Sequence, residues 1–152
     1  MSAERIPPGG RREVGLFTLG LSHAAGRIGR HEPMKLFLIV GRHRWLFRGW
    51  LFFAGRLMPG GRLPRRETEL VILRVAGLRD CRYELMHHKR LGRRAGLSDA
   101  DFQRVTEGPE GAGWSPREQA IMNAVEGLHR DGDLDDETWA ELRRHLDERE
   151  AI

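Results

Sequence analysis

The sequence predicts an all-α fold, and three observations support this prediction. Apolar residues recur at helical spacing in one segment after another, and almost no stretch alternates as a β-strand does. Prolines, glycines and capping serines separate these segments. The chain has 152 residues, of which 39% are hydrophobic and 32% charged, so it can form about one domain with a buried core. We therefore expect a compact helical bundle.

The first part of the chain predicts an arm followed by a long apolar segment. Residues 1–30 form an arm rich in proline and glycine, with a short helix over residues 14–28. The apolar segment over residues 34–58 is rich in tryptophan and phenylalanine and ends at a Pro-Gly-Gly sequence. We interpret it as a core or interface helix. A membrane span needs roughly 20 consecutive apolar residues. This segment does not meet that requirement, because four basic residues interrupt it: Arg42, His43, Arg44 and Arg48.

The remaining residues complete a helical domain over residues 31–152. A helix is predicted over residues 63–78, where Pro64 suits the first turn. A second helix starts near Asp80 and runs to about Ala95. The helix over residues 63–78 carries Glu67, which we predict to be exposed to solvent.

Capping residues place the last three helices. Ser98 starts a short helix that ends near Thr106. Residues 115–118, Ser-Pro-Arg-Glu, form a capping box with proline at the first helical position, and that helix runs to about Arg130. A final helix is predicted to place three apolar side chains on one face: Trp139, Leu142 and Leu146.

Four reactive side chains meet at the corner between the helices over residues 63–78 and 80–95. Glu84 and His88 are four residues apart and share a helix face, and Cys81 lies three residues before Glu84 on the same side. An antiparallel return brings Glu69 opposite these three. A carboxylate in so apolar a segment as the one around Glu69 needs a partner if it is buried.

This corner predicts a proton-transfer or redox site, because it combines a thiol, two carboxylates and an imidazole. We expect Glu69, Glu84 and His88 to lie within reach of a hydrogen bond or one water, in a cavity lined by apolar residues. No metal and no cofactor are needed for either chemistry.

The residues around this corner resemble a known family. The stretches over residues 63–76, 81–88 and 94–98 are similar to the carboxymuconolactone decarboxylase family, which includes alkylhydroperoxidase D. The peroxidase branch has the pattern Glu-x11-Cys-x2-Cys-x3-His, in which a redox-active cysteine pair is backed by the glutamate and the histidine. Glu69, Cys81 and His88 match this pattern, whereas Glu84 stands in place of the second cysteine.

The resemblance implies an all-helical oligomer, a trimer or hexamer, that acts on a small-molecule substrate. At the family level it implies peroxiredoxin-type antioxidant activity, here with a degenerate site that has one cysteine. The catalytic residues implied are Glu69, Cys81, Glu84 and His88. The aromatic residues between positions 45 and 53 would suit burial between subunits.

Because Glu84 stands in place of the second cysteine, two kinds of chemistry remain possible at this site. Cys81 is the only cysteine, so it can form a sulfenic acid or a mixed disulfide but no intramolecular disulfide. Glu84 and His88 fit acid–base chemistry without a cofactor, as the resemblance to the decarboxylase branch implies. The alternative enzyme is therefore a decarboxylase or lactone enzyme of aromatic degradation.

An alternative of another class is a helix-turn-helix protein that binds DNA. Residues 91–105 have the small residues, turn and apolar spacing of that motif. Two acids at the start of the second helix, Asp99 and Asp101, would repel phosphates. The sequence isoelectric point is near 10.1, yet the net charge is only +4 and no block of like charge appears, which argues against nucleic acid.

The composition indicates a cytoplasmic protein. A single cysteine suits a reducing compartment. The first residues lack a basic start followed by an apolar run, so no signal peptide is expected. We expect no association with a membrane.

Overall fold

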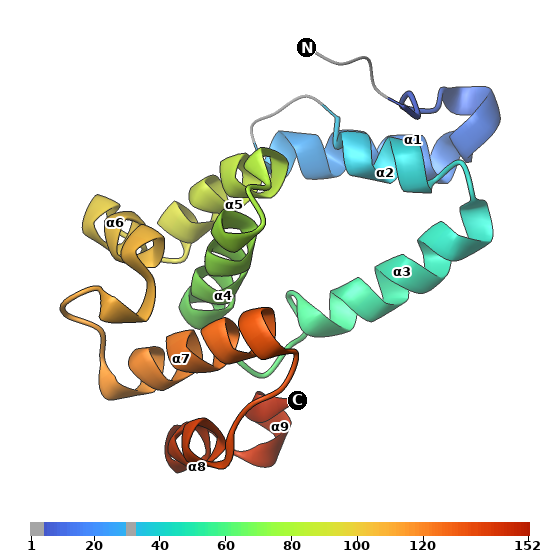
Figure 1. Cartoon of the computed structure of the whole chain (residues 1–152). Helices are drawn as coiled ribbons and strands as arrows, with labels where there is room; N and C mark the ends of the chain where they lie inside the picture. Colours follow the sequence, from blue (N-terminus) through green and yellow to red (C-terminus); the bar gives the residue numbers. More distant parts are fainter. Residues whose placement is uncertain (1–4, 30–32) are drawn as a thin grey trace. The chain divides into compact units, whose positions relative to one another are not determined.

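The computed structural model describes residues 5–29 and 33–152. Within these ranges the chain forms nine α-helices and one short 3₁₀ helix, η1, and no residue of them lies in a β-strand (Figure 1). The predicted all-α fold is therefore confirmed.

The chain divides into two compact units, residues 1–60 and residues 61–152. The division predicted from the sequence, an arm over residues 1–30 and a helical domain over residues 31–152, stays a prediction.

The first unit holds α1 (Arg11–Gly29), α2 (Lys35–Val40) and α3 (Arg44–Leu57). Gly15 kinks α1 with φ 80°, a conformation that favours glycine because it has no Cβ. The apolar segment over residues 34–58 forms two helices rather than one. The break follows Gly41, which ends α2, and the side chain of His43 starts α3 by accepting a hydrogen bond from the Leu46 N–H at 3.1 Å.

Only part of the aromatic content of the first unit is buried. Phe47 is fully buried, and the ring centroids of Phe37 and Trp50 lie 5.4 and 6.1 Å from that of Phe47. Five large apolar side chains of α3 remain exposed: Trp45, Leu46, Phe52, Phe53 and Leu57. Among the described residues, no helix has the length and apolar character that crossing a bilayer would require.

The second unit begins with two antiparallel helices and continues with shorter ones. In chain order its elements are α4 (Arg65–Leu78), α5 (Arg82–Arg94), α6 (Asp99–Glu107), η1 (Gly108–Glu110), α7 (Pro116–Asp131), α8 (Asp136–His145) and α9 (Glu148–Ala151). α4 packs against α5, α6 and α7, and α7 packs against α8.

The helix starts predicted at Ser98 and Ser115 are confirmed, whereas α4 starts at Arg65, with Pro64 as its N-cap residue rather than in its first turn. Ser98 and Ser115 each form a capping box, with Asp101 and Glu118 respectively, and Pro116 occupies the first turn of α7. α7 ends at Gly132, whose φ of 77° lies in the left-handed region. These boundaries depend on neighbours a few residues away, so the local sequence determines them.

The core of the second unit centres on α4 and α7. Leu70 and Leu73 of α4 pack against residues of α7 such as Ile121 and Met122. Burial of each such side chain contributes roughly 1.5–3 kcal/mol. The buried members of this cluster are Leu70, Leu73, Leu97, Val105, Ala120, Ile121, Met122, Ala124, Leu142 and Leu146.

Two sequence expectations about burial differ from the structure. Glu67 is buried rather than exposed, because the guanidinium of Arg117 on α7 donates to both its carboxylate oxygens at 2.9 and 3.1 Å. Arg117 also pairs with Glu150 at 2.7 Å, and this joins α9 to α7. Trp139 remains 45% exposed, although Leu142 and Leu146 are buried as predicted.

Candidate active site

The corner between α4 and α5 is built by a tight reversal of the backbone. Asp80 has φ 47°, a left-handed conformation that aspartate tolerates better than most residues. The N–H of Cys81 then donates to the carbonyl of Ala76 at 2.8 Å, and α5 starts at Arg82 with Cys81 as its N-cap residue. This reversal makes the two helices antiparallel and places Glu69 opposite His88.

Three of the four predicted site residues are in direct contact. The Nδ1–H of His88 donates to Oε2 of Glu69 at 2.7 Å, and Nε2 of His88 lies 3.3 Å from Oε2 of Glu84. The Glu69 side chain is fully buried, that of His88 is 9% exposed and that of Glu84 is 36% exposed. The imidazole therefore connects a carboxylate in the interior with a carboxylate at the surface.

The two carboxylates favour the protonated form of His88. Burial by itself lowers the pKa of the imidazole, but the hydrogen bonds and negative charges of Glu69 and Glu84 outweigh it and raise the pKa of His88 to about 9. The hydrogen bond from His88 in turn lowers the pKa of Glu84 below its usual value. The raised pKa favours the imidazolium form of His88 at neutral pH, with a proton on each ring nitrogen.

Arg65, which the sequence reasoning did not single out, completes this group. Its guanidinium forms an ion pair with Oε1 of Glu69 one helical turn later. Oε1 is buried and has no hydrogen bond of good geometry with any described residue. The spacing of four residues between Arg65 and Glu69 was the available signal, but such spacing is common on helix surfaces.

Cys81 stands at the start of the same helix. Its thiol is free and half-buried, and it makes no capping hydrogen bond to the first turn of α5. No hydrogen bond found in the described part of the chain joins its sulfur to Glu69, Glu84 or His88. The structure thus joins three of the four predicted residues directly and places Cys81 at the N-terminus of α5, without a hydrogen bond to them.

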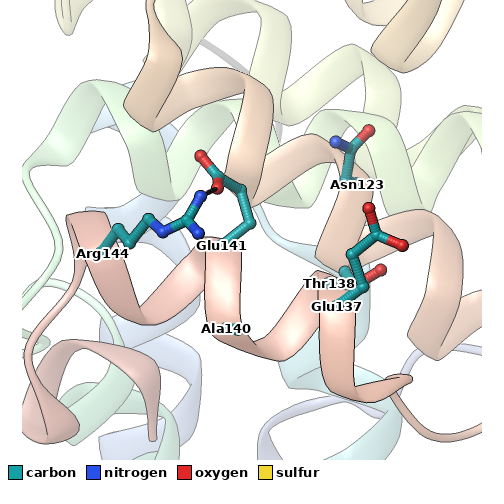
Figure 2. Close-up of a pocket in the computed structure, with 6 residues that line it drawn as sticks. All are labelled: Asn123, Glu137, Thr138, Ala140, Glu141 and Arg144. Atoms are coloured by element: carbon teal, nitrogen blue, oxygen red, sulfur yellow. Dashed lines mark hydrogen bonds and ion pairs between the residues drawn. The ribbon is translucent and has the colours of Figure 1, made fainter.

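Three cavities of the second unit are lined by residues other than the four predicted site residues. One of about 410 Å³ lies between α7 and α8, and Figure 2 shows Glu141 and Arg144, two of its lining residues, paired with each other. A second of about 390 Å³ shares Asn123 and Thr138 with it. A third of about 300 Å³ is mostly apolar and lies between α4, α5 and α6, with Leu85 and Lys89 from α5. None of these three is lined by the four predicted site residues, so the expected apolar cavity around His88 is not among them.

The described residues contain no cluster of side chains with the arrangement of a metal site. No group of three or more histidine, cysteine, aspartate or glutamate side chains there is arranged to hold a metal ion. The donors at the α4–α5 corner are instead joined to one another and to Arg65.

The fold and this corner define a class of all-α protein in which antiparallel helices join a buried glutamate to a histidine. A family model described as the carboxymuconolactone decarboxylase family matches residues 46–127, which is more than half of the chain and includes all four predicted site residues. The chain therefore belongs to the carboxymuconolactone decarboxylase family, as its sequence resemblance predicted. No curated protein and no solved structure matches the chain.

Proposed function

We propose that this protein is an enzyme that uses His88 as the proton donor in acid–base decarboxylation of a small carboxylated lactone, with no cofactor needed. One observation carries the proposal: both ring nitrogens of His88 face carboxylates, Glu69 at 2.7 Å and Glu84 at 3.3 Å. An imidazole held in this way keeps its second proton at neutral pH and can give it up as a general acid. Family membership makes a lactone carboxylate the natural substrate class.

The reaction needs one proton at a defined stage. The bond between the carboxylate carbon and the neighbouring carbon breaks, carbon dioxide leaves, and the electron pair of that bond stays with the lactone. The carbon that holds this pair then takes a proton from Nε2 of His88, the nitrogen turned toward the more exposed Glu84. Glu69 meanwhile keeps Nδ1 protonated, and the neutral imidazole recovers its lost proton from water through Glu84.

A peroxidase-type activity is the second candidate, and the position of Cys81 seven residues before His88 favours it. The Cys81 thiol would lose its proton and its sulfur would attack a peroxide oxygen. The O–O bond would break and the leaving oxygen would take up one proton, so that a thiol and a peroxide give a sulfenic acid and water or an alcohol. Because Cys81 has no cysteine partner in the chain, an external thiol must reduce the sulfenic acid. We therefore expect slow peroxide turnover.

Self-association as a trimer or hexamer is part of the proposal. The five exposed apolar side chains of α3 support it, since large exposed apolar patches commonly mark interfaces. The molar mass from light scattering is then expected to be three or six times the 17.4 kDa of one chain. A mass of one chain at micromolar concentration would contradict it.

A cytoplasmic location and a small-molecule rather than a nucleic-acid partner complete the proposal. Asp99 and Asp101 lie in the first turn of α6, the helix that a helix-turn-helix protein would insert into DNA. Repulsion between these carboxylates and phosphates argues against that alternative.

Assays of variants distinguish lactone decarboxylation from peroxide reduction. Release of carbon dioxide from a γ-lactone that carries a carboxylate, and consumption of peroxide with a dithiol donor, are measured for each protein. We expect His88→Gln to lower lactone turnover by about 10²–10⁴-fold, whereas Cys81→Ser retains it. His129→Gln, a histidine on α7 away from the corner, is the matched control. Fast peroxide turnover that depends on Cys81, with no lactone turnover, would overturn the proposal in favour of the second candidate.

A further inference from the structure

The two oxygens of the Glu69 carboxylate have different partners. Oε2 accepts the hydrogen bond from Nδ1 of His88 at 2.7 Å. Oε1 faces the guanidinium of Arg65. The Glu69 side chain is fully buried, whereas the Arg65 side chain is 36% exposed. Arg65 therefore reaches inward from the surface to a carboxylate that water does not reach.

A buried carboxylate is costly unless a cation or hydrogen-bond donors compensate its charge. His88 compensates one oxygen of Glu69. In the described part of the chain, Arg65 is the cation on the other oxygen, and Oε1 has no hydrogen bond with good geometry there. Loss of Arg65 would leave this oxygen buried without a charged partner.

The proton between Glu69 and His88 has two possible positions. It can stay on Nδ1, which gives a carboxylate and an imidazolium, or move to Oε2, which gives a carboxylic acid and a neutral imidazole. The move transfers one proton across a 2.7 Å hydrogen bond and needs no other reactant. A cation on Oε1 stabilises the carboxylate and so favours the first position.

We propose that Arg65 is a positioning residue whose positive charge, placed on Oε1 of Glu69, holds this proton on Nδ1 of His88 and so keeps His88 ready to act as the acid. The inference rests on the proposed role of His88. The charged and titratable groups that face the imidazole are Glu69 from α4 and Glu84 from its own helix, with His87 acting on Glu84. α4 is the helix packed most extensively against α5. Arg65 of α4 faces Oε1 of Glu69, so it acts on the imidazole of His88 through the Glu69 carboxylate.

The test reads the protonation of His88 directly, by ¹⁵N NMR of histidine side chains at pH 7 in the full chain. The wild-type protein is expected to show both ring nitrogens protonated. Arg65→Gln keeps a hydrogen-bond donor but loses the charge, and we expect its His88 signal to move to that of a neutral imidazole. Arg65→Lys, which keeps the charge, is expected to restore the imidazolium signal. Arg62→Met removes an exposed arginine three residues earlier and is the matched control.

Each result decides the proposal. An unchanged imidazolium signal in Arg65→Gln would overturn it, because the charge would then be unnecessary. If Arg65→Gln does not fold, Arg65→Lys remains decisive, and a neutral imidazole in this variant would overturn the proposal as well. The NMR measurement needs no substrate, so it is independent of whether the lactone assay succeeds. Where lactone turnover is observed, Arg65→Gln is expected to lower kcat about tenfold or more with little change in KM, and Arg65→Lys to recover it.

Discussion

At the scale of single residues, the ionisation of His88 links the site to the stability of the fold. The pKa of His88 is about 9 in the folded chain, against an ordinary value of 6.5. The folded state therefore holds the proton more tightly than the unfolded state does. The protonated His88 side chain therefore stabilises the folded state. This contribution is fully present below pH 6.5 and is lost as the pH rises through 9.

We expect the free energy of unfolding to fall by roughly 2 to 3 kcal/mol between about pH 6.5 and pH 9.5. Urea denaturation at a series of pH values measures it. In His88→Gln this decrease should be largely absent, because the group that titrates is gone. Equal pH dependence in both proteins would show that His88 does not carry the effect.

At the scale of helices, a few arginines on α4 and α7 join elements that are distant in sequence. Arg117 contacts Glu67 on α4 and Glu150 on α9. Arg66 similarly joins α4 to α6 and α7 through Asp101 and Glu118, at 2.7 and 2.9 Å. These contacts position α4, which carries Glu69, relative to the rest of the second unit.

Removal of Arg117 is expected to destabilise the second unit, because the Glu67 carboxylate would stay buried without its partner. We expect Arg117→Met to lower the free energy of unfolding by about 1 to 3 kcal/mol, less than for a fully buried pair because the arginine is partly exposed. Chemical denaturation monitored by circular dichroism measures this loss. Arg149→Met on exposed α9 should change it by less than about 0.5 kcal/mol; a loss of the same size in both variants would contradict this role.

The helix starts at Ser98 and Ser115 and the shared helix face of Glu84 and His88 were predictable from the sequence, because each depends on a short local pattern. The contact between Glu69 and His88 joins residues 19 positions apart, and its prediction depended on the antiparallel return of the two helices. Ser98 and Ser115 cap helices through residues three positions later. The burial of Glu67 was not predictable, because its partner Arg117 lies 50 residues away. The contact from Arg65 to Glu69 was not predictable as a site feature either, since the same spacing serves many exposed ion pairs.

At the scale of the whole molecule, charge is divided unevenly along the chain. Residues 1–60 contain 10 arginine or lysine and 3 acidic residues, a net charge of +7, whereas residues 61–152 contain 16 and 19, a net charge of −3. The acids that surround His88 belong to the second of these units, and the family match extends across both. The net charge of the entire chain thus conceals an acidic unit that holds the candidate site.

We infer that His88 acts as an acid and that the carboxylates of Glu69 and Glu84 favour its protonated form. Lactone turnover by the Cys81→Ser variant, measured from about pH 6 to pH 10, tests it most directly, because no thiol chemistry is then possible. An acid must be protonated to act, so kcat/KM is expected to stay constant at neutral pH and to fall with a midpoint near 9. Turnover that vanishes in this variant, or that rises through pH 9, would contradict the role of His88 as the acid.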